Sequence, residues 1–236
     1  MTALNGRLTG KGLFFAGTDT DVGKTAAAAT AVADLAGMGA RVGIYKPVAS
    51  GARGPGGDAD RLWQAAGRPL SRAVVCPQSF AAALAPVDAA RAEGRAIDED
   101  LLRRGIEPWR AASDLVVVEG AGGLFSPVGP RTLVADLVRE FGLPLVLVDA
   151  ARLGLVGRTL MAVRAACAEG LHVAAVVVSQ TAPPRGEPGD PTGDAAILRS
   201  GLDVLRARLS RIPVGVLAHG AARVEPAIDW MALAGG

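Results

Sequence analysis

The sequence predicts an α/β fold, in which a doubly wound, mostly parallel sheet carries helices on both faces. Three observations predict it: six short apolar runs rich in β-branched residues, helical patterns between these runs, and a glycine-containing loop that joins the first run to an alanine-rich stretch. Strands that are apolar on both sides and alternate with helices are typical of parallel sheets covered on both faces. Half of the 236 residues are apolar, and we expect a single domain over residues 1–236.

The expected strands and helices alternate in a regular order along the chain. The strands are residues 13–16, 42–45, 115–118, 145–148, 173–178 and 214–217. The helices are residues 25–38, a segment that opens at Asp58, and residues 98–111, 132–141, 158–169 and 194–209. In the last helix the leucines 198, 202, 205 and 209 recur at helical spacing and form one apolar stripe. Residues 51–57 and 182–193 are rich in glycine and proline, and we expect them to be mobile surface loops.

The segment from Gly17 to Thr25, Gly-Thr-Asp-Thr-Asp-Val-Gly-Lys-Thr, has the pattern of a phosphate-binding loop. A strand that turns through glycines into a helix points several backbone N–H groups at one spot, where the helix dipole adds positive potential. Lys24 would reach the β- and γ-phosphates, and the Thr25 hydroxyl would bind Mg²⁺. Five residues separate Gly17 from Gly23, one more than in the strict pattern, so either Thr18 takes the first-glycine position or the loop is a variant. The fold is therefore expected to be of the P-loop type.

Lysine is rare in this chain, because only Lys11, Lys24 and Lys46 are lysines among 25 basic residues. Lysine is a compact point charge on a flexible stem, whereas arginine is a planar fork, so each lysine is a candidate for a specific task. Lys46 ends the second apolar run and should emerge at the same edge of the sheet as the phosphate loop. We interpret Lys11, which precedes the first strand, as a solvated charge.

Two carboxylates are candidates for holding a metal near the loop. Glu119 follows Leu-Val-Val-Val and begins Glu-Gly-Ala-Gly-Gly, where a magnesium-holding carboxylate would be needed, although it could instead cap a backbone turn. Asp58 opens a helical segment and could be a metal ligand, a plain N-cap or both. Asp60 is a neighbouring carboxylate to which we assign no role in the site. Ser50 could hydrogen-bond a substrate or belong to an ordinary turn.

Composition and patterning exclude several other classes of function. The formal net charge is only +2 and no basic cluster occurs, so neither nucleic acid nor a membrane surface is an expected partner. No apolar run reaches transmembrane length. Cys76 and Cys167 lack paired spacing, which is typical of buried thiols in a reducing compartment, and we expect a cytoplasmic protein. His172 and His219 have no partners at the spacing of a metal site or a catalytic triad.

Four motifs together resemble those of dethiobiotin synthetases: the loop from Gly17 to Thr25, Lys46-Pro-Val-Ala-Ser-Gly51, Asp58, and Val118-Glu-Gly-Ala-Gly-Gly123. The resemblance extends from the first strand to about residue 217. It implies a homodimer with a P-loop-type sheet that closes a cyclic urea on 7,8-diaminononanoate with CO₂, ATP and Mg²⁺ in biotin synthesis.

The resemblance also implies roles for individual residues. Lys24 and Lys46 would flank the reacting carbamate and phosphoryl groups, and Thr25, Asp58 and Glu119 would hold magnesium. Thr20, Asp21 and Ser50 would lie at the diamine end of the substrate. The start of a helix in the partner subunit, formed by Leu153, Gly154, Leu155 and Val156, would receive the substrate carboxylate. The expected nucleotide contacts are Asp21, Val22, Gly23, Lys24, Thr25, Ala26, Asp58, Glu119, Gly120, Ala121, Gly122, Ser179, Gln180, Leu217, Ala218 and His219.

The chain departs from the family pattern at two dipeptides, at Asp21 in place of glutamate and at Ala218 in place of a proline, and two other readings stay open. Gly157-Arg158 stands where members commonly have Asn-His, and Ser179-Gln180 where they often have Asn-Asp. In those members the asparagine at the position of Ser179 recognises the adenine base. One alternative is a related ATP-dependent ligase of the cobyrinate-synthetase type, although neither cysteine has the surroundings of a glutaminase nucleophile. The other is a nucleotide-switched binding or regulatory protein on the same fold.

Overall fold

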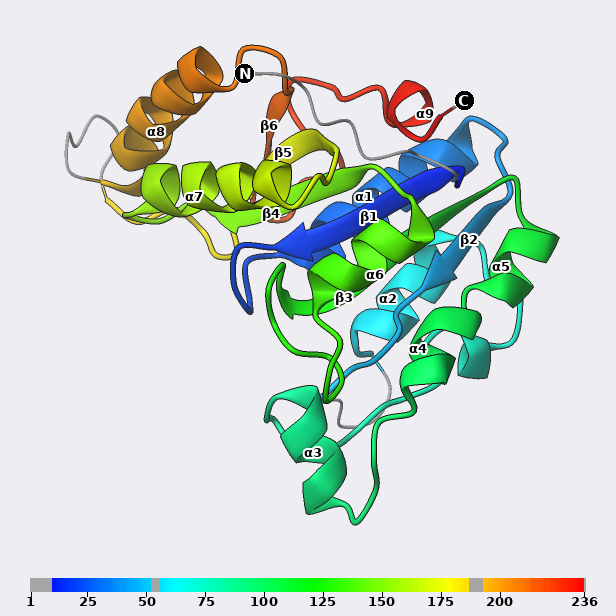
Figure 1. Cartoon of the computed structure of the whole chain (residues 1–236). Helices are drawn as coiled ribbons and strands as arrows, with labels where there is room; N and C mark the ends of the chain where they lie inside the picture. Colours follow the sequence, from blue (N-terminus) through cyan, green and yellow to red (C-terminus); the bar gives the residue numbers. More distant parts are fainter. Residues whose placement is uncertain (1–9, 52–55, 187–192, 236) are drawn as a thin grey trace.

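The computed structural model describes residues 10–51, 56–186 and 193–235 and contains a six-stranded sheet whose paired strands all run parallel (Figure 1). The strand order is β2-β3-β1-β4-β5-β6, which places β1 in the interior of the sheet. The strands are β1 (Gly12–Gly17), β2 (Val42–Tyr45), β3 (Leu115–Gly123), β4 (Leu145–Ala150), β5 (Val173–Ser179) and β6 (Val214–Leu217). Each contains the run that its apolar sequence predicted. Residues 52–55 and 187–192 of the two expected surface loops lie outside the described residues.

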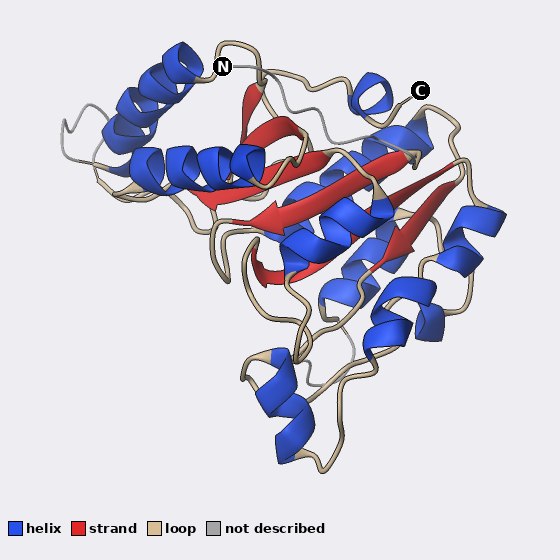
Figure 2. Ribbon diagram, in the orientation of Figure 1, coloured by secondary structure: helices blue, strands red, loops and turns tan. Residues whose placement is uncertain are grey.

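Helices cover both faces of this sheet, with α1 behind it and α6 and α7 in front in the view of Figures 1 and 2. The helices are α1 (Lys24–Gly37), α2 (Asp58–Ala65), α3 (Pro86–Ala92), α4 (Glu99–Arg104), α5 (Glu107–Ala112), α6 (Val134–Phe141), α7 (Leu155–Ala168), α8 (Asp194–Arg208) and α9 (Trp230–Leu233), with one 3-10 turn at Arg72–Val74. The predicted doubly wound α/β fold is confirmed.

The strands are buried on both sides because their apolar residues are covered by a helix layer on each face. Phe14 and Phe15 point to opposite faces of β1 and are both fully buried, one beside Phe141 of α6 and the other beside Trp230 of α9. Burial of this kind contributes about 25 cal/mol per Å² of apolar surface. Because the strands are parallel, their carboxyl ends lie at one edge of the sheet. The buried core on both faces holds that edge in place.

The single helix predicted for residues 98–111 is wrong, because two short helices, α4 and α5, occupy this stretch. The single O–H of Tyr45 is within hydrogen-bond distance of the carbonyl oxygens of Leu101 and Leu102, at 2.9 and 3.0 Å, and so serves groups at the end of α4. A side chain at Gly105 would collide with this hydroxyl. Pro108 then stands in the first turn of α5, where its missing N–H costs nothing.

Two further sequence expectations can be compared with the fold. Cys76 and Cys167 are both free in the described structure, but they are only partly buried rather than enclosed in the core. Among the described residues, no helix is long and apolar enough to cross a membrane.

Candidate functional site

The phosphate loop leaves β1 at the interior of the sheet and enters α1 at Lys24. Gly23 has a φ of 90°, and a Cβ there would collide with the Ser179 hydroxyl, so this position requires glycine. Asp21 also has a positive φ, 54°, although it is not glycine. Such backbone strain clusters at ligand-binding sites. The Lys24 ammonium donates to the carbonyl oxygen of Asp19 at 3.0 Å, which folds the loop back over its own helix.

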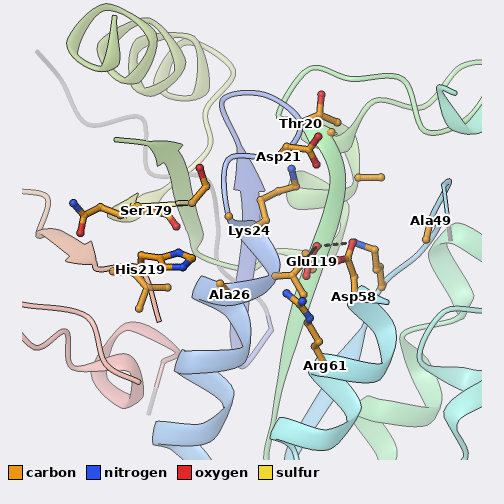
Figure 3. A pocket seen from close by; sticks show the side chains of 18 of the residues that line it. Thr20, Asp21, Lys24, Ala26, Ala49, Asp58, Arg61, Glu119, Ser179 and His219 are labelled. Carbon is orange, nitrogen blue, oxygen red and sulfur yellow. Dashed lines mark hydrogen bonds and ion pairs between the residues drawn. The ribbon is translucent and has the colours of Figure 1, made fainter. Parts of the chain in front are cut away.

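A cavity of about 780 Å³ lies at the carboxyl edge of the sheet, in front of this loop (Figure 3). It brings together most of the residues that the sequence singled out. Those that line it are Thr20, Asp21, Gly23, Lys24, Thr25, Ala26, Lys46, Ser50, Asp58, Glu119, Ala121, Gly122, Ser179, Gln180, Leu217, Ala218 and His219. Residues from β2, β3, β5 and β6 thus converge on the loop that follows β1, as the topology of an open parallel sheet requires.

Lys46 and Glu119, which both line the cavity, form a buried ion pair. The Lys46 ammonium lies 2.6 Å from Glu119 Oε1 and 3.0 Å from Asp58 Oδ2. The Lys46 and Glu119 side chains are only 3% and 1% exposed, whereas that of Asp58 is 50% exposed. Figure 3 shows Asp58 and Glu119 approaching each other from α2 and β3. The single ammonium therefore pairs with two carboxylates that come from different elements, and the three charges together leave one negative charge uncompensated.

One oxygen of Glu119 has no partner in this arrangement. Glu119 Oε1 accepts from Lys46 and from the Thr25 hydroxyl, the latter at 2.9 Å, whereas Oε2 is buried and accepts no hydrogen bond within the described structure. An unsatisfied buried carboxylate oxygen is costly unless a ligand completes it. Carboxylate and hydroxyl oxygens are the donors that Mg²⁺ prefers. The side chains of Thr25, Asp58 and Glu119 therefore fit a magnesium ion.

The cation would not be enclosed by protein alone. Within residues 10–51, 56–186 and 193–235, no group of three or more histidine, cysteine and carboxylate side chains is arranged to hold a metal. Mg²⁺ usually takes one or two protein oxygens and completes its shell with water and phosphate. The few protein oxygens offered by Thr25, Asp58 and Glu119 are consistent with this mode of coordination.

The pKa values of the two lysines in the cavity are shifted in opposite directions. Burial lowers the pKa of Lys24, and the nearby charge of Lys46 lowers it further, while Glu119 opposes both effects. Burial also acts to lower the pKa of Lys46, but the charges of Glu119 and Asp58 outweigh it and leave that pKa above its usual value. For Asp58, burial acts to raise the pKa, and Lys46 more than offsets it, so the net pKa is lowered. Lys46 therefore stays protonated, and Lys24 is the cation less firmly held by protein carboxylates.

Asp60 takes no part in the cavity. Its carboxylate pairs with Arg72 and accepts the backbone N–H of Gly56 at 2.6 Å, which fixes the start of α2. The Arg72 hydrogen bond lowers the pKa of Asp60 to about 2. Asp58 points into the cavity and Asp60 away from it.

Ser179, Gln180 and residues 217–219 form the other end of the cavity, at the ends of β5 and β6. Ser179 is buried behind Gly23, so its side chain is packed against the phosphate loop. Sequence reasoning missed several lining residues: Ala49, Arg61, Thr181, Gly220 and Ala221. Arg61 lies one turn beyond Asp58 on α2 and extends toward the start of α1 in Figure 3. The i, i+3 spacing from Asp58 was the only sequence signal that could have found it.

Some predicted site residues do not line the cavity. Val22 is fully buried under the loop, and Gly120 packs against Phe14 and Val134. The segment 153–156 does start a helix, because Gly154 has a φ of 86° and α7 begins at Leu155, but it lies outside this cavity. Leu153 is 81% exposed.

Comparisons with known proteins show what the whole chain is similar to. A family model described as an AAA domain matches residues 11–219. The protein named ATP-dependent dethiobiotin synthetase BioD in Rhodopirellula baltica is 42% identical over 183 residues, which cover 71% of this chain and 72% of that protein. Its namesake in Anaeromyxobacter sp. strain Fw109-5 is 41% identical over 210 residues, covering 89% of this chain and 90% of that protein.

Solved structures with a similar fold are more distant in sequence. Chloroplast FtsY from Physcomitrella patens has a TM-score of 0.52 at 17% identity, covering 100% of this chain and 68% of that one. The cell division protein FtsY from Thermotoga maritima has a TM-score of 0.51 at 15% identity, covering 99% of this chain and 71% of that one. At this identity the likeness shows the fold alone.

Proposed function

The chain belongs to the dethiobiotin synthetase family, whose members are ATP-dependent ligases of biotin synthesis, and on that premise we propose how its cavity carries out the reaction. The substrates would be 7,8-diaminononanoate, CO₂ and ATP, and the products dethiobiotin, ADP and phosphate. The observation that carries the proposal is the convergence of Lys24, Lys46 and Glu119, whose Oε2 is buried without a partner, on one cavity beside a phosphate loop.

The reaction would proceed in three steps. One amine of the substrate attacks CO₂ and loses a proton, which gives a carbamate. A carbamate oxygen attacks the γ-phosphorus of ATP, and ADP leaves. The second amine then attacks the carbonyl carbon of this mixed anhydride, which closes the five-membered urea ring and releases phosphate and a proton. Positioning and charge neutralisation account for most catalysis of such phosphoryl transfers.

Lys24 and Lys46 would supply the charge that these steps need. Lys24 now rests on the Asp19 carbonyl, a contact that a phosphate oxygen can replace at little cost because both are oxygen acceptors. Lys46 is held in place by Glu119 and Asp58 and points its ammonium into the cavity without a search over rotamers. Such preorganised charge stabilises developing negative charge without further rearrangement.

Thr25, Asp58 and Glu119 would hold the magnesium ion, and the ion when bound would neutralise the β- and γ-phosphate oxygens. Glu119 would offer its unpaired Oε2, which faces no other donor in the described structure. The role of Lys46 in this proposal is to keep both carboxylates charged and aimed at the same place.

The remaining residues are assigned to three parts of the reactants: the diamine, the nucleotide base and the substrate carboxylate. Thr20, Asp21 and Ser50 would bind the diamine end of the substrate. Ser179, Gln180 and residues 217–219 would bind the base. The start of α7 would bind the substrate carboxylate in the site of the partner subunit of a homodimer, because a helix N-terminus attracts anions. The position of Leu153 and Leu155 outside this chain's own cavity supports that assignment.

The test is direct detection of the product. Purified protein is mixed with 7,8-diaminononanoate, bicarbonate, Mg²⁺ and either ATP or another nucleoside triphosphate, and dethiobiotin and phosphate are measured by mass spectrometry and a phosphate assay. We expect one phosphate released for each dethiobiotin formed. Folded protein that binds nucleotide but forms no dethiobiotin would refute the proposed reaction.

A further inference from the structure

A fully buried carboxylate outside the cavity carries an inference of its own. Asp149 lies near the carboxyl end of β4, next to the strand that leads into the phosphate loop, and it is 0% exposed. A buried charge persists only when it is paired and hydrogen-bonded. The partners of Asp149 therefore show what this charge holds together.

Asp149 binds groups from three separate segments. Its Oδ1 accepts from the Thr18 hydroxyl at 2.7 Å, from the backbone N–H of Ala150 at 2.8 Å and from Arg158 Nε at 3.1 Å. Its Oδ2 accepts from the Thr159 hydroxyl at 2.9 Å. Thr18 belongs to the phosphate loop, and Arg158 and Thr159 belong to the first turns of α7.

On one side, this network fixes the entrance of the phosphate loop. The Thr18 N–H donates to the Val148 carbonyl oxygen at 2.9 Å, so both the backbone and the side chain of Thr18 are anchored on β4. The next residue, Asp19, supplies the carbonyl oxygen on which Lys24 rests. Asp149 therefore fixes Thr18, and Thr18 is bonded directly to the residue that holds the Lys24 ammonium.

On the other side, the network fixes the turn that starts α7. Arg158 donates to the Leu153 carbonyl oxygen at 2.9 Å and to the Ala150 carbonyl oxygen at 3.1 Å, while its Nε holds Asp149. Its planar guanidinium thus spans the whole turn between β4 and α7. Its side chain is 25% exposed, so it neutralises Asp149 while keeping partial contact with solvent.

We propose that Asp149 is a positioning residue for both ends of the reaction: it holds the phosphate loop of its own site and the α7 turn proposed to bind the substrate carboxylate in a fixed relation. This proposal rests on the proposed function for its substrate half only. Asp149 touches no reactant, and it acts through Thr18 on one side and through Arg158 on the other.

Three variants separate the two sides. Thr18→Val removes only the loop hydroxyl, and should weaken binding of MgADP about tenfold while the KM for 7,8-diaminononanoate changes less than twofold. Arg158→Gln should raise the KM for the diamine about tenfold and weaken MgADP binding less than Thr18→Val does, because Thr18 and Thr159 still hold Asp149. Asp149→Asn, which keeps the shape and removes the charge, should weaken both. As a control beside these three variants, Thr18→Ser keeps the hydroxyl and should bind MgADP as tightly as the unaltered protein.

The matched control is Asp114→Asn. Asp114 also pairs with an arginine, Arg41, at 2.6 Å, but at the opposite, amino end of the strands. We expect it to leave MgADP binding and the KM for the diamine unchanged. A loss of stability by itself would not produce the split expected of the three variants, so urea unfolding of each variant is measured alongside.

The proposal is overturned if Thr18→Val and Asp149→Asn bind MgADP as tightly as the unaltered protein, whatever their stability, or if all three variants change both constants equally. Calorimetric titration with MgADP needs no turnover. If the unaltered protein forms no dethiobiotin, the proposed function fails, while the titrations of Thr18→Val and Asp149→Asn still decide the loop half of the inference.

Discussion

The pairing of Lys46 with Glu119 makes a sharp prediction for the variant Lys46→Met, which keeps the apolar stem and removes only the ammonium. Glu119 would then be a buried carboxylate with the Thr25 hydroxyl on Oε1 and nothing on Oε2. Removing one partner of a buried ion pair costs about 3–5 kcal/mol. Asp58 adds little, because its side chain is 50% exposed and exposed pairs contribute about 0–1 kcal/mol.

The expected loss of 3–5 kcal/mol is a large share of the 5–15 kcal/mol that stabilises a typical domain. Urea unfolding followed by tryptophan fluorescence measures it, because Trp109 and Trp230 are both buried. The double variant Lys46→Met with Glu119→Gln removes the uncompensated charge and should recover most of the loss. The same single variant should lower kcat about 10²–10³-fold, because a preorganised charge is missing from the site.

Two results would refute this reasoning. An unfolding free energy within 1 kcal/mol of the unaltered protein would mean that Lys46 does not neutralise Glu119. Unchanged turnover at saturating substrate would remove Lys46 from the catalytic residues, whatever its effect on stability. Lys11→Met is the matched control, since Lys11 is exposed and lies outside the cavity.

Three further predictions concern other residues of the site. Glu119→Gln should raise the Mg²⁺ concentration needed for nucleotide binding at least tenfold, and an unaltered magnesium titration would make Glu119 a structural residue. Ser179→Asn should raise the preference for ATP over other triphosphates if position 179 reads the base, and equal competition before and after would reject that role. The pKa of Asp60, lowered by Arg72 to about 2, makes its pair a source of stability that is present above about pH 4 and lost as the pH falls toward 2. Asp60→Asn should remove that acid-sensitive part, about 1–2 kcal/mol after allowance for the half-exposed Arg72, which unfolding at pH 6 and pH 2.5 would measure.

The sheet was predictable because its strands are apolar on both faces, which leaves a continuous signal such as the three valines before Glu119. The extension of β3 to Gly123 was not, since strands and loops both tolerate a glycine run. The division between α4 and α5 depends on Tyr45, a residue from a distant strand, and no local pattern could reveal it.

The centre of the site was predictable for a topological reason: in the sequence Lys24, Lys46 and Glu119 each come after an apolar run, and the carboxyl ends of parallel strands meet. Arg61 and Asp149 escaped attention because neither belongs to a motif. Arg158, which departs from the family pattern, has a physical explanation in the structure, since it neutralises Asp149.

The strand order has a consequence for how the two lysines respond to local opening of the fold. Lys24 follows β1, which is paired on both sides, whereas Lys46 follows β2, which lies at the edge of the sheet and pairs only with β3. Edge segments open with a smaller free energy than central ones. The ion pair between Lys46 and Glu119 therefore stabilises the edge strand β2 and also positions the ammonium in the cavity. Amide hydrogen exchange at Ile44 and Tyr45 should be faster than at Phe14 and Phe15, and ligands that bind Lys46 should slow it.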